Sequence, residues 1–124
     1  MPDMTITTRT AESLVTELFA VIDERRWDDL LTVFAEDGVY LRPGYPALTG
    51  IEAIERFYRH ERIIAAGEHR VEHVVSDLGV AACWGRFTGR SKSGEPLEED
   101  FADAYRVREG RIVHRRTFFF RPAI

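Results

Sequence analysis

Asp103 is the first residue whose setting in the sequence suggests chemistry. It lies within residues 97–120, which read as two strands joined by a turn at Glu109-Gly110 and alternate with the period of a pleated sheet. One face of the first strand combines it with apolar and aromatic side chains: Leu97, Glu99, Phe101, Asp103, Tyr105 and Val107. A carboxylate on an inward face is costly unless it is hydrogen-bonded, paired or protonated. Two interpretations stay open: a carboxyl group that transfers protons, or a counterion for a facing arginine.

Histidines are the second group that could carry chemistry. His69 and His73 have the same parity on a predicted strand, so both should project to one partly apolar face, where an imidazole could act as a general base. A satisfied or surface histidine at a strand start is the simpler interpretation. Along a strand the two side chains would lie about 13 Å apart, too far for one metal ion. His60 and His114 add no ligand set, so we expect no metal.

These residues must be positioned by a domain in which helices come first and strands follow. Helical spacing predicts a first helix over residues 10–24, capped by Thr10, and a second from Trp27 to a stop at Glu36-Asp37-Gly38. A third helix is expected over residues 50–66, with Gly67 as its stop. Strands are expected at residues 39–41, 69–76, 80–90 and in the closing hairpin. This order predicts an α+β fold with helices on one face of a curved antiparallel sheet. Residues 1–9 read as a flexible lead.

Composition excludes several classes of function. A chain of 124 residues that is 44% hydrophobic fits one compact domain. A formal charge of -4 and a pI near 5.6 argue against nucleic acid as a partner. Cys83 is the single cysteine, which excludes an internal disulfide and favours the cytoplasm. The longest apolar run, residues 78–84, is too short to span a membrane, and scattered glycines form no phosphate-binding loop. We expect no cofactor.

Three stretches in this order carry a family resemblance: "ERRWDDLLTVFAEDGVYLRP", "LTGIEAIERFY" and "DFADAYRVREGRIVHRRTFF". They resemble the nuclear transport factor 2-like superfamily, in its SnoaL-like and ketosteroid-isomerase-like branch. The resemblance implies that residues 10–124 form a single SnoaL-like domain, a cystatin-like α+β barrel shaped as a cone around a deep pocket. It also implies a homodimer. The run Phe118-Phe119-Phe120, which places large apolar groups on both faces of the last strand, predicts that the dimer forms through the outer face of the sheet. The superfamily contains isomerases, polyketide cyclases, dehydratases, epoxide hydrolases and non-catalytic members, so fold alone does not select a function.

The catalytic pattern of ketosteroid isomerases is matched only in part. Asp103 falls where those enzymes keep a protonated acid that helps to hold an oxyanion. Their general base falls on Arg42 and their oxyanion tyrosine on Leu18, which argues against steroid isomerisation. The limonene-type epoxide hydrolases have an aspartate where this chain has Thr117, so their mechanism is not expected either.

A closer match is the aspartate-histidine dyad of the scytalone dehydratase and hexachlorocyclohexane dehydrochlorinase relatives. In them an aspartate near the end of the first helix orients a histidine that takes a proton from carbon. The counterparts here are Asp23 with His69 or, as the second choice, His73. The resemblance therefore implies a lyase, isomerase or cyclase that works by proton transfer, and the alternative is a non-catalytic binding or dimerisation module.

The pocket lining also follows from the resemblance. Its expected members are Phe19, Tyr40, Arg42, Phe57, Trp84, Arg86, Phe101, Tyr105, Arg115 and Thr117. Several arginines around Asp103 would suit an anionic small-molecule substrate, because guanidinium binds carboxylate through paired hydrogen bonds. A closed, polar-tipped pocket would favour chemistry, and a collapsed one would favour the non-catalytic module.

Overall fold

The fold, seen in a computed structural model that describes residues 10–119, begins with the helix α1 (Ala11–Asp23). Thr10 caps this helix by accepting a hydrogen bond from the backbone N–H of Ser13 (3.0 Å), and an apolar stripe that includes Leu14 and Leu18 is buried. A short 3₁₀ turn, η1 (Trp27–Asp29), leads into α2 (Leu30–Val33). The helix α3 (Ile51–Arg56) continues into a π-helical turn, η2 (Phe57–Glu61).

Six strands form one sheet in the order β3-β2-β7-β6-β5-β4. Their bounds are β2 (Phe34–Leu41), β3 (Leu48–Thr49), β4 (Ile64–Asp77), β5 (Val80–Ser91), β6 (Pro96–Arg108) and β7 (Arg111–Phe119). All neighbours pair antiparallel except β2 and β7, which run parallel. The expected α+β class and curved sheet are confirmed, but the sheet is mixed rather than wholly antiparallel and does not close into a barrel.

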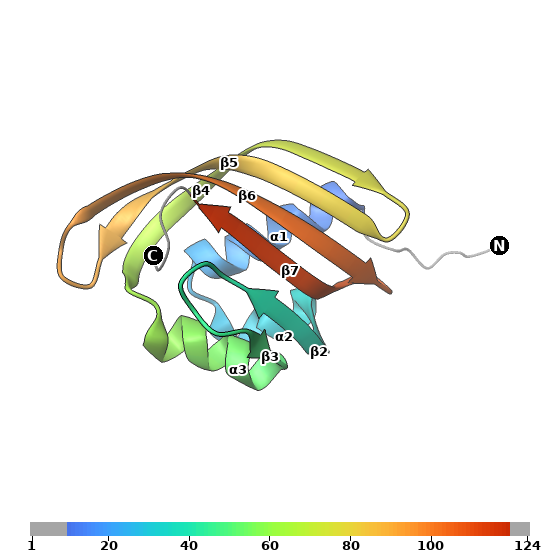
Figure 1. Cartoon of the computed structure of the whole chain (residues 1–124), viewed down its shortest axis with the longest axis horizontal. Coiled ribbons are helices and arrows are strands. Elements are labelled where there is room, and N and C mark those ends of the chain that lie inside the picture. Colours follow the sequence, from blue (N-terminus) through green and yellow to red (C-terminus); the bar gives the residue numbers. More distant parts are fainter. Residues whose placement is uncertain (1–9, 120–124) are drawn as a thin grey trace.

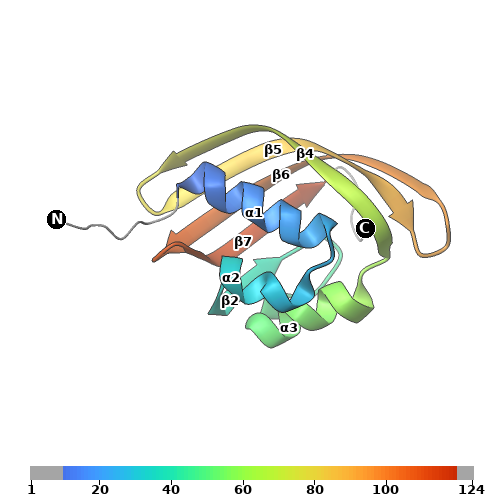
Figure 2. The same ribbon diagram turned by 180° about the vertical axis from the view of Figure 1, so that it is seen from behind.

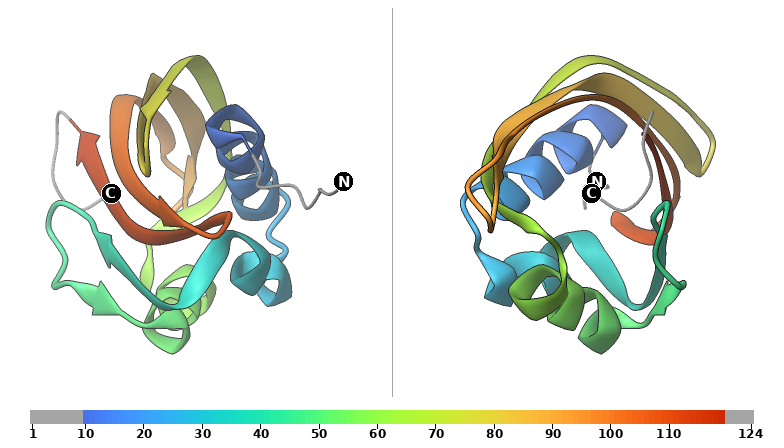
Figure 3. Two further views of the ribbon diagram at one scale, coloured as in Figure 1. Left: turned by 90° about the vertical axis from the view of Figure 1, so that its right-hand side faces the viewer. Right: turned by 60° about the vertical axis from the view of Figure 1, so that its left-hand side comes forward.

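The sheet bends around α1. Strands β4 to β7 arch over this helix, and α2 and α3 lie on the same concave side (Figure 1). The reverse view shows α1 lying along the inner face of the sheet (Figure 2). Seen along the arch, α2 and α3 lie across from the strands, so helices and sheet surround a common interior (Figure 3). That interior is where inward-facing side chains of the sheet meet those of α1.

The hairpin of β6 and β7 confirms the alternation predicted for it. Glu109 and Gly110 both have left-handed backbones (φ 54° and 77°), as a tight hairpin turn requires. Along β6 the inward-facing residues Glu99, Phe101, Asp103 and Tyr105 are each at most 5% exposed. The hairpin therefore carries Asp103 into the interior, as the sequence predicts.

Two predicted helix ends are wrong. The strand β2 begins at Phe34, where continued helix was expected, because residues of β7 pair with this segment from Phe34 onward. Helix ends at Glu61 rather than near Ala66, and β4 begins at Ile64. Gly67, taken as a helix stop, instead lies inside β4 opposite Gly89, and a Cβ there would lie 2.3 Å from the Phe87 ring. Residues 1–9, the expected lead, and Phe120 lie outside the described part of the chain.

Candidate active site

Asp23 and His69 meet where the last turn of α1 approaches β4. The helix ends there because Arg25 adopts a left-handed backbone (φ 58°), and the Arg25 guanidinium donates to the backbone oxygen of Ala65 (2.6 Å). Asp23 Oδ1 lies 2.7 Å from His69 Nδ1, and Asp23 Oδ2 accepts the His69 backbone N–H at 2.8 Å. One carboxylate thus fixes both the ring and the backbone of His69. This is the contact expected between these two residues.

The His69 ring lies among aromatic side chains. Phe19 stacks on it with ring centroids 4.4 Å apart, Phe87 is tilted at 4.7 Å, and Phe101 meets it edge-on at 5.3 Å. Burial lowers the pKa of the His69 imidazole below its usual value, although the hydrogen bond and charge of Asp23 act in the opposite direction. The imidazole is therefore neutral near pH 7. With Nδ1–H donated to Asp23, the basic lone pair is on Nε2, which makes no hydrogen bond to any described residue.

His73 does not share this site, and the expectation that both histidines face the same side is wrong. A β-bulge at Glu72 shifts the register of β4, so that Val71 lies opposite Gly85 but His73 lies opposite Trp84. An extra residue exchanges the inner and outer faces of a strand. His73 is exposed on the convex face, where its ring lies 5.2 Å from the 41%-exposed Trp84.

Trp84 and Arg86 were expected in the pocket lining and are also on the convex face. They follow the outward parity of β5, whereas Gly85 and Phe87 point inward. Arg86 donates to Asp100 (2.8 Å) and Glu98 (3.1 Å), two exposed carboxylates on the neighbouring strand. The resemblance to the isomerases placed Trp84 and Arg86 in the pocket lining, but in the structure both side chains lie on the outer face of β5.

Asp103 is the centre of a buried polar cluster. Its Oδ2 accepts from Tyr105 (2.7 Å) and from Nε and Nη2 of Arg115 (3.1 and 3.0 Å), while its Oδ1 accepts from Thr117 (2.6 Å). The carboxyl group thus faces four donor atoms and is 1% exposed as a residue. Of the two interpretations left open, this geometry fits a counterion of Arg115 rather than a protonated acid that donates to an oxyanion.

Tyr40 extends this cluster toward Arg42. Its hydroxyl accepts from Arg42 Nη1 (2.7 Å) and lies 2.9 Å from Thr117 Oγ1, which itself donates to Asp103. Burial alone would raise the pKa of Tyr40, but the charges of Arg115 and Arg42 outweigh it and the pKa lies below its usual value. The interior around Tyr40 therefore favours negative charge.

Three interior residues were missed by sequence reasoning. Tyr58 accepts from Arg115 Nη1 (2.8 Å), and burial raises the pKa of Tyr58 to about 12. Phe87 covers His69, and its inward parity opposite Trp84 was the signal that could have found it. Arg62, 4% exposed, lies over the rings of Trp27 and Tyr58, and burial lowers the pKa of Arg62 to about 10. No sequence signal marks Arg62, because charged residues after a helix are usually solvated.

Eight of the expected lining residues do surround the interior: Phe19, Tyr40, Arg42, Phe57, Phe101, Tyr105, Arg115 and Thr117. Phe19 separates the two polar groups, since its ring stacks on His69 on one side and the Arg115 guanidinium lies 5.5 Å from its centroid. Aromatic side chains thus fill the space between the Asp23–His69 pair and the Asp103 cluster.

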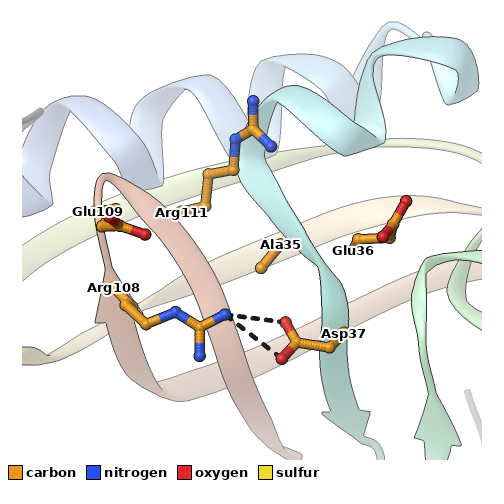
Figure 4. Close-up of a pocket in the computed structure, with 6 residues that line it drawn as sticks. All are labelled: Ala35, Glu36, Asp37, Arg108, Glu109 and Arg111. Carbon is orange, nitrogen blue, oxygen red and sulfur yellow. Dashed lines mark hydrogen bonds and ion pairs between the residues drawn. The ribbon is translucent and has the colours of Figure 1, made fainter.

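Five of the cavities among residues 10–119 have volumes of about 260 to 510 Å³, and neither Asp23 nor His69 lines any of these five. The largest lies at the surface beside the β6–β7 turn, where Arg108 bonds both oxygens of Asp37 (3.0 and 3.3 Å) and Glu36 and Arg111 point away from that pair (Figure 4). Its charged groups are solvated, so we assign it no chemistry. A cavity of about 330 Å³ lies where β2 ends beside β7, and Arg42 and Thr117 are among the residues that line it.

Within residues 10–119 no group of three or more His, Cys, Asp or Glu side chains is arranged to hold a metal ion. In the same part of the chain no helix has the length and apolar character needed to cross a membrane.

A family model for the SnoaL-like domain matches residues 15–115, most of the chain. The chain belongs to the SnoaL-like family. The resemblance to the nuclear transport factor 2-like superfamily is thereby confirmed, and the SnoaL-like match begins within α1 and ends within β7. No functionally curated protein matches the sequence.

Solved structures support the same fold. A candidate SnoaL-like polyketide cyclase from Jannaschia sp. CCS1 is 16% identical, with a TM-score of 0.76 over 92% of this chain and 91% of that one. A protein from Catenulispora acidiphila with a ketosteroid isomerase-like fold, solved with trimethylamine, is 21% identical (TM-score 0.78, 88% and 86% covered). An M. tuberculosis epoxide hydrolase of the LEH-like type is 16% identical (TM-score 0.73, 86% and 79% covered). At these identities the three neighbours establish the fold and leave the reaction to be argued from the site.

Proposed function

We propose that this SnoaL-like protein is a cofactor-independent lyase, isomerase or cyclase in which His69 removes a proton from a small-molecule substrate. The observation that carries the proposal is the 2.7 Å contact between Asp23 Oδ1 and His69 Nδ1, with Nε2 left without a hydrogen bond to any described residue. A base oriented by a carboxylate and presenting a free lone pair is the arrangement that general-base catalysis needs.

Each partner has a defined part in this reaction. Asp23 holds the tautomer in which Nε2 is basic, and it stabilises the imidazolium that forms when His69 takes the proton. The lowered pKa of His69 keeps the ring unprotonated near neutrality, so the base is ready without prior deprotonation. Positioned proton transfer of this kind contributes typically about 10²- to 10⁴-fold in rate.

Negative charge that develops on the substrate would be stabilised by the buried cations. Arg115 lies on the other side of Phe19 from His69, and Arg42 bonds the Tyr40 hydroxyl beside it. An anionic substrate fits this interior because three buried guanidinium groups, those of Arg42, Arg62 and Arg115, outnumber the two buried carboxylates of Glu99 and Asp103. Asp103 has no proton-transfer role in this proposal. It holds Arg115 in place.

A second candidate function, a non-catalytic binding module, is favoured by the packing around the base. Phe19, Phe87 and Phe101 pack against the ring of His69, and this residue lines none of the five cavities described above. The two candidates therefore differ in whether these three rings give way to a substrate at Nε2.

The protein is further proposed to be a cytoplasmic homodimer. Supporting the dimer, Trp84, Ala102 and Phe118 lie side by side across β5, β6 and β7 on the convex face, with Trp84 and Phe118 41% and 51% exposed. An apolar row of this kind on an open sheet face is typical of an interaction surface. Supporting the location, Cys83 is buried as a free thiol.

Proton exchange tests the reaction. Compounds that raise the melting temperature are incubated with the protein in D₂O, and loss of a C–H signal by NMR reports proton abstraction. We expect Asp23→Asn and His69→Gln each to slow exchange by about a hundredfold or more while remaining folded. His60→Gln, at an exposed helical position, is the matched control and should exchange at the wild-type rate.

Wild-type exchange in folded His69→Gln would refute the general-base proposal. Stabilising compounds that bind without any exchange would favour the binding module instead.

A further inference from the structure

The outward side of β6 carries its charges in a regular order. From the start of the strand, its outward residues are Glu98, Asp100, Ala102, Ala104 and Arg106. Two acids therefore come first, two small residues lie in the middle and a base follows. Ala102 is half-buried, and the other four residues are exposed. Such an order is complementary to itself when the strand faces a second copy of the same strand that runs in the opposite direction.

A row of large side chains lies next to a row of small ones on the same face. Ala102 pairs with Trp84 on β5 and with Phe118 on β7, which are 41% and 51% exposed. In the next row, Ala104 pairs with Ala82 on β5. Sheets that pack face to face lie about 10 Å apart with interdigitating side chains, so large residues of one sheet need small residues across from them. The convex face offers such a place one row away from its own aromatic rings.

The acidic end of β6 is only partly neutralised by its own chain. Arg86 on β5 donates to Asp100 (2.8 Å) and to Glu98 (3.1 Å), so one guanidinium serves two carboxylates. Arg90, one row farther along β5, donates to the backbone oxygen of Gly94 (2.9 Å). The two rows of β5 and β6 that hold these carboxylates therefore contain one more negative than positive charge.

The other end of this face is basic. Arg106 lies there on β6, and Arg116 lies on β7 with its guanidinium 5.9 Å from the Phe118 ring. His114, which pairs with Arg106, is half-buried. The edge strand β4 adds exposed charges of both signs: Glu68, Arg70, Glu72 and Asp77. The change of sign across the centre of the convex face therefore follows β6.

We propose that a second copy of this chain packs on the convex face with its β6 antiparallel to the β6 of the first, about a two-fold axis that crosses the strands between Ala102 and Ala104. Asp100 then faces Arg106 of the partner subunit, and the symmetry makes this contact twice. Trp84 lies over Ala82 of the partner subunit. A parallel arrangement would instead place Asp100 against its own copy. The inference deepens the proposed homodimer by fixing its orientation, and it rests on that part of the proposed function alone.

Neutral variants test the orientation by sedimentation equilibrium. In the antiparallel dimer, Asp100→Asn and Arg106→Gln each remove two attractive contacts, so each should raise the dissociation constant of the dimer severalfold. A parallel dimer would gain affinity from the same changes, because they remove like charges that face each other. The matched controls lie outside the sheet and should leave the dissociation constant unchanged: Asp28→Asn, which breaks an exposed ion pair with Arg59, and Arg56→Gln at an exposed helical position.

Charge reversal gives a stronger test. Asp100→Arg and Arg106→Asp each place like charges across the antiparallel interface and should weaken self-association by about tenfold or more. The double variant Asp100→Arg/Arg106→Asp exchanges the two charges and should dimerise to within severalfold of the wild type. Salt at about 1 M should reduce these differences, because it screens exposed charges.

The outcomes separate the orientation from the dimer itself. A wild-type dimer whose dissociation constant is unchanged or lowered in folded Asp100→Asn and Arg106→Gln would overturn the orientation and leave the homodimer standing. A wild type that is monomeric at micromolar concentration would overturn both. If a charge-reversal variant fails to fold, the two neutral variants decide. The general-base reaction is read separately, by proton exchange, and stands or falls with His69→Gln.

Discussion

At the scale of single residues, the environment of His69 decides how the site responds to pH. Burial among Phe19, Phe87 and Phe101 lowers its pKa, while Asp23 limits the decrease. Without Asp23 the ring would be buried with neither nitrogen bonded to a described residue. The Asp23–His69 pair therefore provides two properties that a general base requires: burial away from water and a fixed orientation of the ring.

The first residue-scale prediction concerns stability against pH. The pKa of His69 is lower in the folded chain than its unfolded value of about 6.5, so below that pH the unfolded chain binds more protons. The contribution is fully present above pH about 6.5 and is lost as the pH falls through the folded pKa. Urea unfolding of the wild type between about pH 5 and pH 8 should therefore show stability falling with acid.

His69→Gln should have a shallower loss of stability over this pH range, and His60→Gln the wild-type slope. A wild-type slope in His69→Gln would contradict the prediction. The His69 imidazole signals followed by NMR should titrate with a midpoint below about 6.5.

The second residue-scale prediction compares two arginines. Arg115→Met leaves Asp103 as a buried charge without its ion-pair partner, and it should lower the free energy of unfolding by about 3–5 kcal/mol in urea titrations. Arg86→Met breaks the ion pairs with the exposed Glu98 and Asp100 and should cost at most about 1 kcal/mol. Equal losses of unfolding free energy in the two variants would show that the buried Asp103–Arg115 pair contributes no more to stability than the exposed ion pairs of Arg86.

At the scale of elements, sequence patterns predicted those features that depend on residues close together in the chain. The cap at Thr10, the alternation along β6 and the turn at Glu109-Gly110 were all read correctly, because each depends on residues within one element. The start of β2 at Phe34 depends on pairing with β7, far along the chain, which no local pattern contains.

The candidate site could likewise be predicted only in part. Asp23 at a helix end and His69 on the next strand could be paired from the resemblance, since both lie on the inward faces of regular elements. His73 could not be assigned correctly, because a bulge at Glu72 has no signature in a strand of mixed polar and apolar residues.

The prediction at this scale concerns Gly85, which lies opposite Val71 beside the bulge. A Cβ there would lie 2.0 Å from the backbone oxygen of Arg70, so Gly85→Ala forces β4 and β5 apart. We expect a loss of about 1–3 kcal/mol or more in urea unfolding. Ala82→Gly, in the same strand, is the control and should cost about 1 kcal/mol or less. A neutral Gly85→Ala would mean that the bulge can relax without cost.

At the scale of the whole molecule, the convex face is the surface that a dimer would bury. Trp84→Glu places a charge in the apolar row of Trp84, Ala102 and Phe118 and should convert a dimer into a folded monomer, measured by sedimentation equilibrium. Leu78→Glu, at a 94%-exposed turn position, should remain dimeric. A wild-type monomer at micromolar concentration would contradict the dimer.

The parallel pairing of β2 with β7 also sets an order of events during synthesis. Tyr40 leaves the ribosome long before Thr117, the residue 77 positions later whose hydroxyl it contacts. Until β7 has left the ribosome, β2 cannot pair with it and Asp103 cannot form its ion pair with Arg115. Contacts between residues so far apart in the sequence form slowly, and until they form the nascent chain exposes apolar strand residues. We therefore expect the nascent chain to fold late and all at once, with chaperones protecting it until the last strand is released.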